Sequence, residues 1–243
     1  MKPLLLMQTG DAPKTVQQVH ANFDHMFLQQ GHIAPERVQI VHLLSGEQPL
    51  PPESYCGVVI TGSPAMVTER LPWSEHAAEW LRQAMRIRLP LFGVCYGHQL
   101  VAYALGGDVG YHPQGMEAGT LEIELLPAGA NDRRLMLLPP RFKANLIHAQ
   151  SVLTPPSGAK VLARSAQDAY QILSYGDNAL TTQFHPEFNG AIMHHYLDWL
   201  AELNPERQAE YFNKQQHVSD TPFSQRLLQG FVVSLGAQQA LAG

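Results

Sequence analysis

Cys95, in the segment FGVCYGHQL, has the sequence surroundings of a nucleophile. It follows a short apolar run and precedes a helical pattern. A side chain at a sharp strand-to-helix turn is held away from the sheet, and the helix start supplies unpaired N–H groups and a positive dipole end that favour a thiolate. Gly93 and Gly97 provide the space that such a turn needs. Taken alone, Cys95 is equally compatible with a small buried apolar residue, as most unpaired cysteines are.

The segment TTQFHPEF supplies the base and the carboxylate that a catalytic thiol requires. His185 ends a β-type run, where the ends of parallel strands gather active sites, and Pro186 fixes the backbone between it and Glu187. An imidazole can accept the thiol proton and later protonate the leaving group, while a carboxylate holds the ring in the useful tautomer. Because the chain has 12 histidines, only the combination with Cys95 makes this a prediction.

Five segments, in this order, resemble the class I glutamine amidotransferase family of the triad type. They are VVITGSPAMV (58–67), LPLFGVCYGHQLVAYALGG (89–107), HPQGMEAG (112–119), HAQSV (148–152) and TTQFHPEF (181–188). Within that family the chain is most similar to stand-alone proteins related to the amidotransferase domain of GMP synthase. The α/β-hydrolases and the DJ-1-like group also place a cysteine at such a turn, but neither explains all five segments together.

The resemblance implies a role for each matching residue. Cys95 would be the nucleophile, His185 the base and Glu187 the third member of the triad. The TGSP loop aligns with the family's oxyanion loop, so the N–H of Gly62 or a neighbour would act together with that of Tyr96. Such donors contribute about 3 kcal/mol each where they have been dissected.

Two further residues match family positions near the substrate. Gln99, one helical turn after Cys95, would lie near bound glutamine, although a helix-surface role is nearly as compatible with the pattern. His148 would lie at the mouth of the site. The remaining histidines, including the adjacent His194 and His195, lack the spacing of metal ligands, so the sequence predicts no metal and no cofactor.

The implied reaction is hydrolysis of the glutamine side-chain amide. Thiolate attack would give a γ-glutamyl thioester, and water would then release glutamate, with ammonia as the other product. The sequence has no G-x-x-x-x-G-K-[ST] phosphate loop, so we expect any ammonia-accepting synthase to be a separate partner. A second hypothesis is a γ-glutamyl peptidase acting on γ-glutamyl amides or glutathione-type conjugates, and a third is a non-catalytic regulatory module.

Composition narrows the other function classes. The 243 residues are 45% hydrophobic and 15% charged, which is enough to fill a sizeable core. The net charge of −5 and the scattered 16 Lys and Arg residues argue against nucleic acid as a partner. No apolar run approaches the roughly 20 residues that span a bilayer, and two cysteines with no secretion signal predict a cytoplasmic protein.

The elements that must position these residues follow from the periodicity. Strand-like runs alternate with amphipathic helical segments in the first half, and β-type runs dominate from about 108 to 185. We expect an α/β protein with the flavodoxin-like fold of the family: a mostly parallel central sheet, helices on both faces and an antiparallel extension. The expected strands are 3–8, 37–44, 55–62, 89–95, 120–126, 142–152, 159–165, 171–176 and 179–184, and the expected helices are 14–30, 74–86 with Ser74 as N-cap, 96–107, 189–203 and one or two around 225–241.

No repeat or flexible linker divides the chain. We predict an amidotransferase-like domain over 1–206 and a C-terminal helical extension over 207–243. The extension lies outside the resemblance, and its apolar helix face favours packing on the domain over binding a second copy. The oligomeric state is left open.

Overall fold

The central sheet begins with a parallel half. In the computed structural model, which describes residues 2–241, five strands lie side by side in the order β2-β1-β3-β4-β11, and every neighbouring pair is parallel. This is the flavodoxin-like order, with its site expected at the carboxyl ends of the strands. The strands are β1 (Leu4–Gln8), β2 (Val38–His42), β3 (Gly57–Ile60), β4 (Leu91–Val94) and β11 (Ala179–Thr182).

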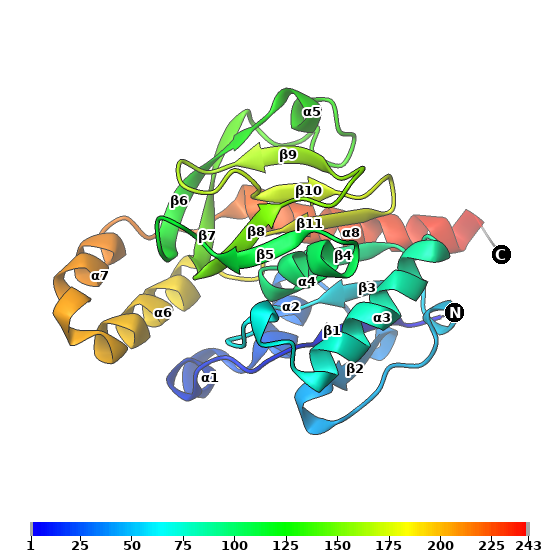
Figure 1. Cartoon of the computed structure of the whole chain (residues 1–243), viewed down its shortest axis with the longest axis horizontal. Helices are drawn as coiled ribbons and strands as arrows, with labels where there is room; N and C mark the ends of the chain where they lie inside the picture. Colours follow the sequence, from blue (N-terminus) through cyan, green and yellow to red (C-terminus); the bar gives the residue numbers. More distant parts are fainter. Residues whose placement is uncertain (1, 242–243) are drawn as a thin grey trace.

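An antiparallel extension continues the sheet from β11 (Figure 1). Its strands, in spatial order, are β10 (Ile172–Ser174), β9 (Lys160–Arg164), β6 (Glu117–Leu125) and β7 (Arg141–His148). A separate two-stranded sheet joins β5 (Asp108–Tyr111) to β8 (Gln150–Thr154). The prediction of one strand over 142–152 was therefore wrong, because the chain leaves one sheet after His148 and enters the other at Gln150.

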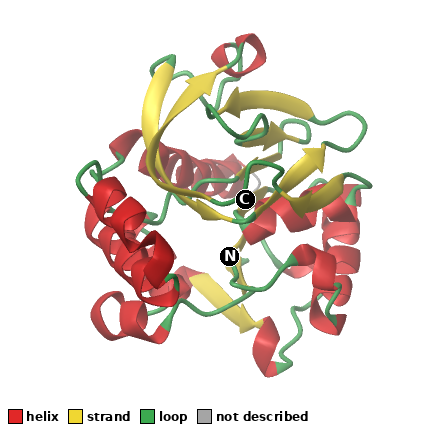
Figure 2. Ribbon diagram, turned by 60° about the vertical axis from the view of Figure 1, so that its left-hand side comes forward, coloured by secondary structure: helices red, strands yellow, loops and turns green. Residues whose placement is uncertain are grey.

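Helices cover both faces of the sheet (Figure 2). Leu5 and Met7 of β1 pack with the helices of one face, and Leu4 and Leu6 pack with those of the other, as the period of a strand requires. The first face carries α3 (Pro72–Arg86) and α4 (Tyr96–Ala104), and the second carries α1 (Lys14–His20), α2 (Phe23–Gln30), α6 (Gly190–Leu203), α7 (Gln208–Gln215) and α8 (Pro222–Leu241). The short α5 (Pro127–Ala130) lies beside β9.

The structure corrects three predicted boundaries. The helix expected over 14–30 is two helices, because the Asn22 side chain accepts from the N–H of Phe23 and caps α2, while Ala21 has a φ of 62°. The helix expected at Ser74 begins at Pro72, a residue suited to a first helical position. The strand expected over 37–44 ends at His42 and is followed by a 3₁₀ turn.

The last helix lies against the main sheet. The Phe231 ring of α8 packs 5.5 Å from that of Phe92 in β4, and Gln225 and Gln229 donate hydrogen bonds to the Gln30 side chain and backbone. In Figure 1, α8 is the long red helix behind the strands. Residue 1 of the predicted domain (1–206) and residues 242–243 of the predicted extension (207–243) lie outside the described part of the chain. Over residues 2–241, every helix is too short or too polar to cross a lipid bilayer.

Candidate active site

Cys95 occupies a strained turn between β4 and α4. Its backbone has φ 51° and ψ −101°, a conformation that costs a non-glycine residue free energy and persists only where surrounding contacts enforce it. A Cβ at Gly93 would lie 2.9 Å from the Gly97 carbonyl oxygen, and one at Gly97 would lie 2.7 Å from that of Ile60. Both flanking positions therefore require glycine, as the sequence indicated.

His185 and Glu187 form a buried pair next to this turn. The Nδ1 atom of His185 lies 2.7 Å from Oε1 of Glu187, and both side chains are almost fully buried. The backbone N–H of Cys95 donates to the Thr182 carbonyl at 2.8 Å, which joins the cysteine turn to the strand end that carries His185. Underneath, the Phe188 ring stacks on the imidazole at 4.2 Å and 12°.

The electrostatics of His185 favour a ring that keeps its proton. Burial alone would lower the pKa of His185. The negative charges of Glu187 and of a Cys95 thiolate outweigh this effect and raise the pKa to about 10. Nε2, the second ring nitrogen, is buried and makes no hydrogen bond at ordinary distance within residues 2–241. The Cys95 thiol instead donates to the Ile147 carbonyl, 3.7 Å from Sγ. Catalytic hydrogen bonds often tighten only when substrate binds.

The predicted oxyanion residues border the same space. A Cβ at Gly62 would lie 3.0 Å from Cε1 of His185 and 3.6 Å from Cβ of Cys95, so the loop backbone runs directly against both side chains that the sequence predicts to be catalytic. The Thr9 hydroxyl holds this loop by donating to the Gly62 carbonyl at 3.0 Å. Tyr96 is the first residue of α4, where backbone N–H groups lack partners inside the helix. The oxyanion assignment of Gly62 and Tyr96 stays a prediction.

Gln99 and His148 both line the cleft beside Cys95. Gln99 is buried rather than on the helix surface, and its Nε2 donates to the Gln150 carbonyl at 2.6 Å and to the Gln183 side chain at 3.1 Å. Its amide N–H groups thus already fix neighbouring residues. Substrate contact by either residue stays a prediction.

Comparisons with known proteins identify the family of the chain. The family model described as glutamine amidotransferase class-I matches residues 15–199. The chain belongs to this family. A GMP synthase [glutamine-hydrolyzing] of Aeropyrum pernix is 38% identical over 131 residues, which are 54% of this chain and 24% of that protein. The chain therefore spans about a quarter of the length of this relative.

Two further comparisons cover nearly the whole amidotransferase chain. Gamma-glutamyl peptidase 3 of Arabidopsis thaliana is 24% identical over 229 residues, 92% of this chain and 91% of that protein. The crystal structure of a glutamine amidotransferase from Thermotoga maritima superposes with a TM-score of 0.73 at 18% identity, covering 98% of each chain. The family resemblance and the flavodoxin-like fold predicted from the sequence are confirmed.

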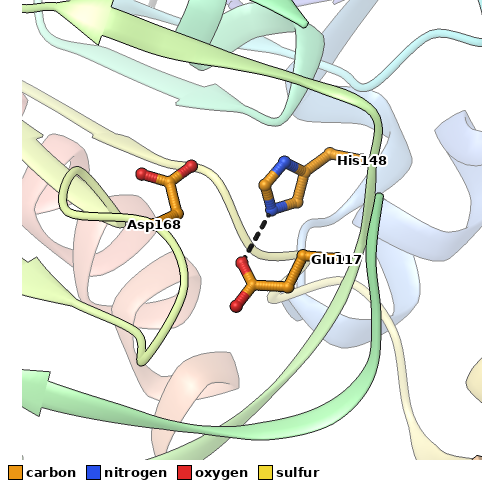
Figure 3. Close-up of side chains that lie close together, drawn as sticks. All are labelled: Glu117, His148 and Asp168. Carbon is orange, nitrogen blue, oxygen red and sulfur yellow. Dashed lines mark hydrogen bonds and ion pairs between the residues drawn. The ribbon is translucent and has the colours of Figure 1, made fainter. Parts of the chain in front are cut away.

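Sequence reasoning missed a buried network behind His148 (Figure 3). His148 Nε2 lies 3.0 Å from Oε2 of Glu117, the residue directly opposite it in the β6–β7 register. Ser165 donates to Oε1 of the same carboxylate and Gln171 to Oε2, and Asp168 lies nearby. The residue types suit a divalent cation, but Glu117 and His148 already have hydrogen-bond partners at each oxygen and nitrogen. We therefore assign the cluster to holding His148 in place.

A second buried histidine lies on the far side of this network. His98 of α4 is completely buried, and its Nδ1 lies 2.8 Å from the Thr181 hydroxyl. Burial lowers the pKa of His98 to about 4, although the charge of Asp168 opposes the shift. The site thus combines a buried histidine on α4 whose pKa is lowered with His185, whose pKa is raised.

The cleft has a volume of about 450 Å³ and an unusual lining. Its inner end holds Cys95 and His185, and its outer part is mainly apolar. Among the described lining residues there is no lysine or arginine, and Asp11 is the one carboxylate. Three side chains of α6, Trp199, Leu200 and Leu203, form part of the outer wall.

Proposed function

We propose that this chain hydrolyses the side-chain amide of a γ-glutamyl group by cysteine-dependent acyl transfer, with glutamine as the first candidate substrate. The supporting observation is the strained Cys95 turn hydrogen-bonded to the strand that ends beside the His185–Glu187 pair. A strained nucleophile, a base and a carboxylate that orients the base form the general arrangement of nucleophilic catalysis.

The steps follow from these positions. The Cys95 thiolate attacks the amide carbon, and the N–H groups of Gly62 and Tyr96 stabilise the oxyanion. The carbon–nitrogen bond then breaks as His185 gives its proton to the departing nitrogen, leaving a γ-glutamyl thioester. His185, now neutral, accepts a proton from water, which attacks the thioester and releases glutamate and the thiol.

With glutamine as substrate the departing molecule is ammonia. The GMP synthase relative is a longer protein of which this chain matches 24% of the length, so we propose a separate synthase partner as the acceptor of ammonia. The reactive thiol and the absence of a disulfide at either cysteine favour a reducing compartment, and we propose the cytoplasm.

A second candidate is a γ-glutamyl peptidase. The near full-length match to a gamma-glutamyl peptidase and the size of the cleft favour it. Cavities of about 300 to 1,000 Å³ accommodate drug-sized ligands, so 450 Å³ leaves room for a leaving group larger than ammonia. The acyl half of the reaction is the same in both candidates.

The test is steady-state hydrolysis of L-glutamine and of γ-glutamyl peptides by the full chain, with Cys95→Ala as the blank. Rapid acid quench followed by mass spectrometry should detect a γ-glutamyl adduct on the peptide that carries Cys95. Release of glutamate without any such adduct, or undiminished release by Cys95→Ala, would reject the mechanism.

A further inference from the structure

One wall of the cleft carries apolar side chains that hydrolysis of glutamine itself does not require. Trp199, Leu200 and Leu203 recur at helical spacing on α6 and line the cleft together. Leu203 has 58% of its surface exposed, so this part of the wall is accessible to a ligand in the cleft. We propose that this wall is a leaving-group subsite for an uncharged, apolar amine, so that the preferred substrates are γ-glutamyl amides of such amines. This proposal rests on the proposed function.

The wall and the proposed proton donor belong to one cavity, because Trp199, Leu203 and His185 all line it. His185 protonates the departing nitrogen, and from His185 an aromatic row runs outward. Phe188 stacks on the imidazole, Tyr196 stacks on Phe188 at 4.8 Å, and Trp199 meets Tyr196 edge to face at 6.1 Å. Phe188 has no exposed surface and does not border the cleft, so this row supports Tyr196 and Trp199 from behind, and these two border the cleft together with His185.

The opposite wall is apolar and also begins at the nucleophile. The Ile147 carbonyl oxygen lies 3.7 Å from Sγ of Cys95, and the Ile147 and Met116 side chains belong to strand β7 and to the residue before β6. Both line the cleft. The apolar space is thus continuous with the reacting atoms and forms part of the same cavity.

Charge argues for a neutral leaving group. No lysine or arginine occurs among the described residues that line the cleft, so a leaving group ending in a carboxylate, as in glutathione, would lose its hydration without gaining a cation. Asp11 is the one carboxylate there, but its Oδ1 already accepts hydrogen bonds from Gln8 at 2.9 Å and from Asn22 at 2.6 Å. A positively charged leaving group would therefore compete with these two donors for Oδ1 of Asp11.

The chemistry is that of the proposed mechanism, except that an alkylamine leaves in place of ammonia. The thiolate forms a carbon–sulfur bond, the carbon–nitrogen bond breaks, and the proton of His185 leaves on the amine. Water then gives a proton to His185 and forms the carbon–oxygen bond of glutamate, while the carbon–sulfur bond breaks and frees the sulfur of Cys95. No oxidant, reductant or second substrate is required.

A homologous series of substrates tests the subsite. We would measure kcat/KM for the γ-glutamyl amides of methylamine, butylamine and hexylamine, whose nitrogens have similar basicity, together with glutamine and the amides of 6-aminohexanoate and a diamine. Each buried methylene is expected to raise kcat/KM by up to about fourfold. We expect the hexyl to methyl ratio to exceed tenfold and the 6-aminohexanoate amide to be a poor substrate.

Two variants of Leu203 locate the effect on α6. Leu203→Ala should lower the hexyl to methyl ratio severalfold, whereas Leu137→Ala, at an 81% exposed leucine outside the cleft, should not change it. Leu203→Lys should raise kcat/KM for the 6-aminohexanoate amide, because it supplies the missing cation. Since Leu203 is half exposed, both variants should fold.

The outcomes separate the two proposals. Equal kcat/KM along the alkyl series, with glutamine cleaved and a thioester on Cys95, would overturn the subsite and leave the proposed function standing. A preference for the diamine amide would also overturn it and would transfer recognition to Asp11. Failure to cleave any γ-glutamyl compound, with no adduct on Cys95, would reject the proposed function and the subsite with it.

Discussion

Glu187→Gln is the substitution that most directly tests the triad. It keeps the size and shape of the side chain while it removes the negative charge 2.7 Å from Nδ1 of His185. Glu187 has no exposed surface, so solvent cannot replace the lost charge. The glutamine amide can present either its N–H group or its oxygen to Nδ1 of His185. If it presents the N–H, Nδ1 must lack its proton, which is the wrong tautomer of the imidazole.

The magnitude follows from the kind of hydrogen bond that is lost. Hydrogen bonds to charged groups contribute about 1.5 to 3 kcal/mol, and one pKa unit corresponds to about 1.4 kcal/mol. Removing the charge should therefore lower the pKa of His185 from about 10 by about 1 to 2 units. Because the same hydrogen bond also fixes the orientation and tautomer of the ring, its loss should lower kcat/KM about 10- to 100-fold near pH 7.

The assay is the pH dependence of kcat/KM between pH 6 and 10.5 with a saturable γ-glutamyl substrate. In the native protein His185 must keep its proton to protonate the leaving group, so activity should decline only as the pH approaches about 10. In Glu187→Gln the decline should begin at a lower pH. Glu202→Gln, at an exposed residue of α6, is the matched control for loss of one carboxylate.

The result that would refute this reasoning is specific. If Glu187→Gln folds, keeps more than a tenth of the native kcat/KM and shows the same alkaline decline, then Glu187 does not hold the charge of His185. A change in melting temperature alone would not count as support, because loss of a buried hydrogen bond destabilises the fold whatever its catalytic role.

Three further predictions follow from the same site. Gly62→Ala should lower kcat about 10- to 100-fold with little change in melting temperature, because the new Cβ would lie 3.0 Å from His185 Cε1; native kcat would contradict this. Cys95 should react with iodoacetamide faster than the more exposed Cys56, as peptide mapping would show; the reverse order would favour a non-catalytic module. The lowered pKa of His98 means that the unfolded chain takes up a proton near pH 6.5 and the folded one only near pH 4, so stability is lost as pH falls through this window, by about 3 kcal/mol. Urea titrations should show a shallower loss for His98→Asn, and an equal loss would refute the assignment.

The parts of the site that are local in sequence could be predicted from it. Cys95 is marked by the glycines that its turn requires, and His185 and Glu187 lie two positions apart at a strand end. The residue types mark these positions in the sequence, although the contact that requires Gly97, with the Ile60 carbonyl, comes from the neighbouring strand β3. The parallel strand order is likewise constrained, because alternating strands and helices have few ways to form one sheet.

The parts that depend on register could not be predicted. Glu117 is 31 positions from His148, and only the antiparallel pairing of β6 with β7 places them opposite each other. Sliding that pairing by one residue would turn the carboxylate to the other face. The division of 142–152 between two sheets has the same origin, because it depends on pairing with strands far along the chain. The break at Asn22 depends on hydrogen bonds closer in sequence, which the helical periodicity did not reveal. Asn22, for example, also accepts from the N–H of Ala12.

The division of the sheet suggests how this site separates chemistry from specificity. Strands β4 and β11 of the parallel half hold the nucleophile turn and the start of the His185 segment, tied by the Cys95 N–H to Thr182 carbonyl bond. The proposed leaving-group walls come from elsewhere, from α6 and from the antiparallel extension near Ile147. Because Cys95 is strained, small shifts of the parallel half should impair the reaction itself, whereas a change at Leu203 alters only what surrounds the departing amine. Substrate preference in this chain should therefore respond to substitutions on α6 long before the rate of thioester hydrolysis does, since the amine has already left when water attacks.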